Sequence, residues 1–173
     1  MEWVAPDVSR LSPATVSTER KMLEDWLDYH RQTLLSKCAG LTADQLKTKA
    51  AAPSNLSLLG LVRHMAEVEG SWFRRRIAGE QFDFLFSSED DIDGDFDNVA
   101  SADARSDLTV YLREIELAKE AVAGRSLDDV FFHPRRGVEM SVRWVYLHMI
   151  EEYARHNGHA DLLRERIDGR TGA

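Results

Sequence analysis

The sequence is poor in cysteine, in long apolar runs and in clustered positive charge. Cys38 is the only cysteine, so no disulfide can form within the chain, which indicates a reducing compartment. No catalytic base is visible near Cys38, which we interpret as a small buried residue. No apolar stretch approaches the roughly 18 residues that span a membrane, and the N-terminal residues lack the apolar segment of a signal peptide. We therefore expect a cytoplasmic protein.

Acidic residues outnumber basic ones, 30 against 22, which gives a net charge of -8. Nucleic-acid binding requires clustered lysine and arginine. The basic runs at 74–76 and 135–136 are short and are interpreted as a helix end and a loop in solvent. We therefore expect neither a nucleic-acid partner nor a membrane partner.

The length of 173 residues and the hydrophobic content of 43% are typical of one globular domain. We expect a single domain over residues 1–173, with an N-terminal arm at 1–17 and an acidic loop at 80–100. Apolar side chains recur at helical spacing in four long segments, which predicts an all-α fold. The expected helices run from Ser12 or Thr18 to Cys38, and over 57–78, 102–123 and 141–167. Short capped turns are expected at Thr42 and Ser126, and 133–137 is expected to be a loop.

Several residues recur at an offset of 84 positions. Gly40 is repeated by Gly124, Thr42 by Ser126, Ser57 by Ser141 and His64 by His148. This pattern predicts two related halves, each made of a long helix, a short turn and a second long helix.

The segment 80–100 contains many carboxylates and no lysine or arginine. A helix–loop–helix calcium site starting at Asp91 fails, because the turn glycine is misplaced and Ala102 stands where the bidentate glutamate is needed. We therefore interpret the segment as a loop in solvent, attached to the bundle through Phe82, Phe84 and Phe86.

The strongest candidate for chemistry is a divalent-metal site. Glu152 and His156 lie one turn apart on the inward stripe of the last long helix, where an unpartnered carboxylate is costly to bury. His64 lies on the inward stripe of the second long helix and could supply a third ligand. Two imidazoles and one carboxylate leave a coordination position open, as in reactive metal sites. The spacing also leaves open a polar feature of the core without metal.

The remaining histidines have weaker patterns. His148 lies one turn before Glu152 and His159 lies three residues after His156, so both are rival ligands. We expect His148 to pack against neighbours or to make outer hydrogen bonds. No partner pattern accompanies His30 or His133.

Two stretches carry a resemblance to a known family. Residues 61–72 (LVRHMAEVEGSW) resemble the second-helix signature of the DinB-like superfamily, and residues 144–165 resemble its fourth-helix signature. The similarity extends from about Thr18 to Gly172. It implies an up-down-down-up four-helix bundle with a long crossover loop, and one divalent metal ion in a cleft.

The resemblance also implies a ligand set and an activity. Members commonly use three histidines, of which His64 and His156 match two. Glu152 departs from that pattern and resembles the mycothiol-dependent maleylpyruvate isomerase branch, whose ligands are His, Glu and His. Zinc is the first choice of metal, with nickel, iron or manganese as alternatives. Characterised relatives use mycothiol, bacillithiol or glutathione, which implies a transferase or isomerase acting on a small electrophile.

Other functions fit the same residues. The ligand set could activate water in a hydrolase, hold iron(II) for oxygen chemistry, or belong to a non-catalytic binding protein. No catalytic or cofactor-binding residue beyond the metal ligands is assigned. Trp72, Trp144 and Tyr153 are close enough in sequence to line the cleft. Related bundles often form homodimers, although no interface stripe is visible in this sequence.

Overall fold

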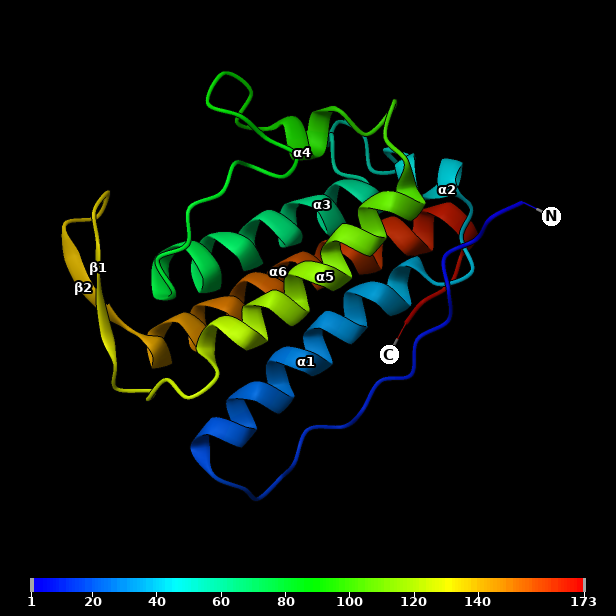
Figure 1. Ribbon diagram of the computed structural model, residues 1–173. Helices are drawn as coiled ribbons and strands as arrows, with labels where there is room; N and C mark the ends of the chain where they lie inside the picture. Colours follow the sequence, from blue (N-terminus) through cyan, green and yellow to red (C-terminus); the bar gives the residue numbers. More distant parts are fainter. Residues whose placement is uncertain (1, 173) are drawn as a thin grey trace.

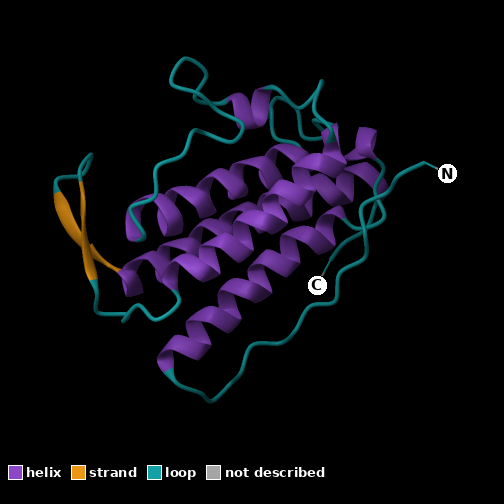
Figure 2. Ribbon diagram, in the orientation of Figure 1, coloured by secondary structure: helices purple, strands orange, loops and turns teal. Residues whose placement is uncertain are grey.

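The computed structural model describes residues 2–172 and is mostly helical (Figures 1 and 2). The helices are α1 (Glu19–Cys38), α2 (Ala43–Lys47), α3 (Leu58–Glu69), η1 (Gly70–Ile77), α4 (Gly94–Asp97), α5 (Ala104–Val122) and α6 (Val142–Asp168). Two short strands, β1 (Val130–His133) and β2 (Val138–Ser141), form an antiparallel hairpin between α5 and α6.

The long helices lie side by side around one hydrophobic core. α1 packs along α6, α3 packs along α5, and α3 also contacts α6. Figure 1 shows α1 and α6 running in one direction while α3 and α5 run in the other. Leucine, methionine and tyrosine side chains fill the centre, and the largest are less than 2% exposed. Within residues 2–172, no helix is both long and apolar enough to cross a membrane.

Side-chain caps fix where the helices begin. Thr18 caps α1, so the alternative start at Ser12 was wrong. Thr42 forms a complete capping box with Gln45 at α2. The two serines that recur 84 residues apart, Ser57 and Ser141, cap α3 and α6 in the same way, each accepting a bond from the backbone amide three residues later.

The π-helical segment and the strand hairpin were not predicted. The second long helix changes from α to π geometry at Gly70, so η1 follows α3 without a break and carries Trp72 and the arginine run. The strands of the β1–β2 hairpin flank residues 134–137, which form a turn within the expected loop. The run Val130-Phe131-Phe132 favours strand because branched and aromatic side chains suit a pleated surface, and Gly137 takes the left-handed conformation (φ +66°) that closes the hairpin turn.

The long crossover between η1 and α5 passes over α3 (Figure 1). It contains the short helix α4, so the interpretation of 80–100 as a plain solvated loop was wrong in part. Gly94 and Asp95 are buried there, although the neighbouring acidic residues are exposed. Phe82 and Phe86 pack beside Arg74 and Arg63, at 4.2 and 4.6 Å from ring centre to guanidinium, and attach the crossover to the bundle.

Candidate metal centre

The structure brings together the three residues predicted as metal ligands. His64 comes from α3, and Glu152 and His156 come from successive turns of α6. One donor atom of each lies within 4.8 Å of the others, and all three side chains are half-buried. The Nε2 atom of His156 is 3.5 Å from Oε2 of Glu152, and the His64 and His156 rings are 4.8 Å apart between centroids.

His64 is oriented by the crossover. Its Nδ1 lies 2.8 Å from Oδ2 of Asp95, a residue that is only 4% exposed. The Phe96 ring stacks on the imidazole at 4.8 Å. The Asp95 carboxylate accepts a hydrogen bond from Nδ1–H of His64. The other ring nitrogen, Nε2, therefore keeps its lone pair free. A carboxylate behind a histidine in this way sets the tautomer of many metal-ligating histidines.

Asp95 was missed at the sequence level. It is one of eight acidic residues between 80 and 100, and spacing alone does not separate it from the others. The apolar Phe96 beside it was the only local sign that this part of the acidic segment folds back onto α3.

His156 is held in its neutral form. Burial lowers its pKa to about 4, and the nearby His64 and His159 imidazoles act in the same direction. A neutral imidazole is the form that can donate a lone pair to a metal. The Nδ1 atoms of His159 and His156 lie 3.4 Å apart. His159 therefore contacts the cluster through the His156 ring.

His148 packs between two tryptophans. Its ring stacks on Trp144 and meets the edge of Trp72, each at 4.8 Å. Its Nε2 is 3.6 Å from Oε1 of Glu152. Packing of His148 against neighbours was the expected arrangement. His148 also belongs to a second candidate group with Glu151 and Glu152, but Glu151 in that group is exposed at the helix surface.

The cluster suits a divalent ion by donor chemistry and by spacing. A tetrahedral ion with bonds of about 2.0–2.2 Å separates its ligand atoms by roughly 3.3–3.6 Å. The 3.5 Å between His156 Nε2 and Glu152 Oε2 lies within that range. The remaining separations are within 4.8 Å and need only small side-chain movements. Two imidazoles and one carboxylate also leave room for a further ligand.

A cavity of about 590 Å³ opens beside the cluster. His64, Asp95 and Trp72 form part of its wall, together with Arg75 from η1 and Arg135 from the hairpin turn. Trp72 therefore lines the cavity as expected, and Trp144 packs behind it at 5.4 Å between ring centroids. The expectation for Tyr153 was wrong, because its side chain is fully buried and points into the core instead.

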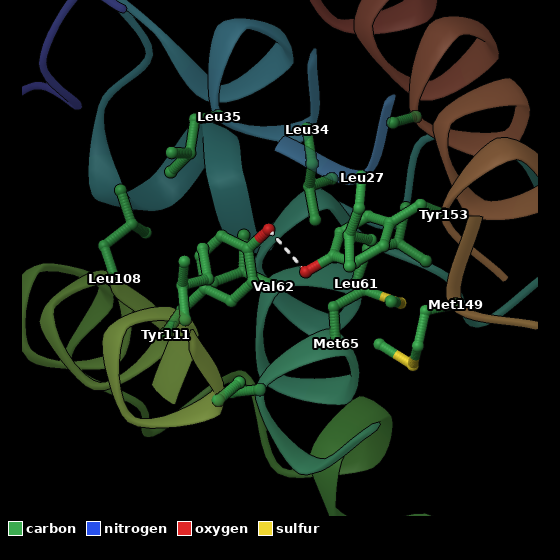
Figure 3. Packing of buried hydrophobic residues seen from close by; sticks show 14 of the residues in the cluster. Leu27, Leu34, Leu35, Leu61, Val62, Met65, Leu108, Tyr111, Met149 and Tyr153 are labelled. Carbon is green, nitrogen blue, oxygen red and sulfur yellow. Dashed lines mark hydrogen bonds between the residues drawn. The ribbon is translucent and has the colours of Figure 1, made fainter. Parts of the chain in front are cut away.

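Tyr153 belongs to a closed polar network inside the core, of which Figure 3 shows the contact between the Tyr111 and Tyr153 hydroxyls. The Tyr153 hydroxyl donates to Oε1 of Glu69 at 2.7 Å and lies 2.9 Å from the Tyr111 hydroxyl. Arg31 donates to both oxygens of Glu69, at 2.7 and 2.6 Å. Burial tends to lower the pKa of Arg31, but the Glu69 charge outweighs it and raises that pKa well above its usual range. Burial and the Glu69 charge raise the pKa of Tyr153, which keeps its donating proton.

A second cavity of about 590 Å³ lies between α1, α5 and α6. Arg31 and Asp28 line it, but they are bonded to each other at 2.8 Å, and Arg31 is also bonded to Glu69. None of the three candidate ligands lies in its wall. The cavity beside His64 is therefore the better place for chemistry.

Comparison with known proteins places this architecture in a family. A model of the mycothiol-S-transferase family, a DinB-like family, matches residues 22–169. The chain belongs to the mycothiol-S-transferase family. The matched range includes His64, Asp95, Glu152, His156 and both cavity arginines. No curated protein and no solved structure shows significant similarity to the chain.

Proposed function

We propose that the chain is a divalent-metal-dependent transferase that joins a mycothiol-like thiol to a small electrophile. Membership of the mycothiol-S-transferase family supports the thiol and the reaction class. The observation that carries the proposal is the convergence of His64, Glu152 and His156, whose donor atoms lie within 4.8 Å of one another, beside a cavity that His64 lines. The opposed helix directions in Figure 1 also support the up-down-down-up bundle with a long crossover.

His64, Glu152 and His156 would hold the ion, with zinc as the first choice and nickel, iron or manganese as alternatives. The ion would supply Lewis acidity, which lowers the pKa of a bound thiol so that it is present as the reactive thiolate. Asp95 holds the His64 ring in the orientation that keeps Nε2 free. The low pKa of His156 keeps its ring neutral and able to coordinate.

The cavity has room for two small reactants side by side, since 590 Å³ is within the range of about 300–1,000 Å³ for ligand pockets. In the transfer, a sulfur electron pair forms the new S–C bond. The bond between carbon and the leaving group breaks, and its electron pair departs with the leaving group. The thiol proton passes to solvent. Trp72 gives the wall an apolar, aromatic part.

Thiol-dependent turnover tests the proposal. Zinc-loaded protein would be assayed with 1-chloro-2,4-dinitrobenzene in the presence and absence of mycothiol. We expect product only with thiol, and its loss in Glu152→Gln. The matched control is Glu151→Gln, one residue away on the exposed face, which should retain activity because Glu151 faces solvent.

Other outcomes would contradict the proposal in distinguishable ways. Consumption of the electrophile without thiol would indicate a metal-dependent hydrolase, and turnover that requires oxygen would indicate an iron enzyme. Binding of thiol without any turnover would indicate a non-catalytic binding protein. A cytoplasmic location, where thiols are kept reduced, a single domain and a homodimer remain predictions, testable by cell fractionation, limited proteolysis and light scattering.

A further inference from the structure

Four arginines gather at one side of the cavity beside His64. Arg75 and Arg76 come from η1, and Arg135 and Arg136 come from the turn of the β1–β2 hairpin, which contacts η1. Figure 2 shows the hairpin standing at the end of the bundle, where η1 ends and α6 begins. In the sequence the two runs are separate, and each was interpreted as a group of solvated residues. The hairpin brings them together.

Within residues 2–172, none of these four arginines forms an ion pair with a carboxylate. Arg74, their neighbour on η1, shows the contrast, because it pairs with Glu80 and Glu114 at 2.8 Å each. Such an unpaired group is notable in a chain with a net charge of -8. Burial lowers the pKa of Arg76, and the charges of the other three arginines lower it further. Within the described residues, no direct ion pair offsets their mutual repulsion.

Neutral groups hold the half-buried arginines in place. Arg76 lies over the Trp72 ring at 4.7 Å and donates from Nη1 to the Ser71 carbonyl at 2.9 Å. Arg75 donates from Nη2 to the Phe82 carbonyl at 2.9 Å and lies 5.1 Å from the Phe84 ring centre. Because these contacts add no negative charge, the positive field at the cavity remains available to a ligand.

Two of the four arginines, Arg75 and Arg135, reach the cavity wall itself. The wall also contains three carboxylates, and two of them are already bonded. Asp95 is bonded to His64, and Oε1 of Glu67 accepts from the amides of Phe86 and Ser87 at 2.6 and 3.0 Å. The third, Glu89, is exposed at the rim.

We propose that Arg75 and Arg135 bind an oxyanion, carboxylate or phosphate, carried by the electrophilic substrate. Guanidinium groups donate paired hydrogen bonds that match both kinds of oxyanion. His64 lies in the same wall, so an anion held by the arginines places the rest of the molecule against the candidate metal ligands. The description of this ligand as the electrophile rests on the proposed function, whereas the anion site rests on the arginines alone.

Anion binding to metal-free protein tests the site without any turnover. Succinate and inorganic phosphate would each be titrated while the intrinsic fluorescence of the four tryptophans is followed, of which Trp72 and Trp144 lie near the arginines. We expect at least one of the two anions to bind. The anion that binds more tightly shows whether the site prefers a carboxylate or a phosphate. In Arg75→Gln/Arg135→Gln the Kd should rise by about tenfold or more. The control Arg105→Gln/Arg113→Gln removes the same two charges from exposed sites on α5 and should leave the Kd within about twofold.

No binding of either ion to the wild type, or equal losses in the double variant and the control, would overturn the proposal. If the double variant does not fold, Arg135→Gln alone carries the test, because Arg135 is exposed on the hairpin turn. A second measurement compares kcat/KM for 4-chloro-3,5-dinitrobenzoate with that for neutral 1-chloro-2,4-dinitrobenzene. The ratio should fall by about tenfold in the variant, and an unchanged ratio would contradict an anionic electrophile.

The two proposals fail in different ways. If the wild type binds anions through Arg75 and Arg135 but shows no thiol-dependent turnover, the anion site stands and the transferase proposal fails. If turnover requires thiol and metal but is indifferent to both arginines, the transferase proposal stands and the anion site fails.

Discussion

The same two helices carry two polar clusters that differ in how their charges are satisfied. Glu69 on α3 and Tyr153 on α6 point into the core, where Arg31 and Tyr111 satisfy them completely. His64 on α3 lines a cavity, and its donor atom lies within 4.8 Å of those of Glu152 and His156 on α6. Adjacent residues, Glu152 and Tyr153, therefore belong to opposite kinds of site. A closed network contributes to the fold, and an open one is available to a ligand.

The largest expected effect comes from breaking the closed network. Glu69→Gln keeps the size of the side chain but removes the buried counter-charge of Arg31, which is left with the more exposed Asp28 alone. We expect a loss of about 3–5 kcal/mol in the free energy of unfolding, measured by urea denaturation. Asp28→Asn is the matched control, since Asp28 is the other partner of Arg31 but its side chain is 36% exposed. That change should cost less than about 1 kcal/mol. Equal losses would contradict the distinction between buried and exposed partners.

A smaller effect is expected when the candidate metal ligand His64 loses its hydrogen bond to Asp95. Asp95→Asn removes the charge behind Nδ1 of His64, so the ring is no longer held in one tautomer. Zinc affinity should fall by about 10–100-fold, measured by competition with a chromophoric chelator. Asp97→Asn, an exposed change in the same short helix, should have no measurable effect. An unchanged affinity in Asp95→Asn would show that the 2.8 Å contact has no role in metal binding.

The smallest effect concerns the Cys38 thiol in the core, which we expect to be unreactive in the folded protein. Cys38 is fully buried, and burial raises the pKa of its thiol to about 12 although Arg164 acts in the opposite direction. Below that pH the folded protein holds a neutral thiol, which is a poor nucleophile. We expect no labelling by iodoacetamide near pH ~8 under native conditions, and complete labelling in urea. Rapid labelling of the native protein would contradict the closed core.

The sequence predicted the parts of the molecule that depend on helical spacing. The inward stripe of α6 placed Glu152 and His156 on one face, and the stripe of α3 placed His64 opposite them. The caps at Thr42, Ser57 and Ser141 located helix starts because capping is a local interaction.

Features that depend on the path of the chain between helices were not predictable in this way. Asp95 reaches His64 only because the crossover folds back over α3, and no spacing rule describes that path. Arg31 and Glu69 meet across 38 positions of sequence. The hairpin joins Arg135 to Arg75, although the same residues looked like solvated surface when each run was considered alone. Each of these contacts depends on tertiary packing.

The most direct test of the central claim is the metal content of the purified chain. Protein without a histidine tag would be analysed by elemental mass spectrometry as wild type, His64→Ala, Glu152→Ala and His156→Ala, with Glu151→Ala as the matched control. We predict about one divalent ion per chain in the wild type and in the control, and loss of the ion in the other three variants. No bound ion in the wild type, even after reconstitution with zinc, nickel or iron, would contradict the account and leave the cluster as a polar feature of the bundle.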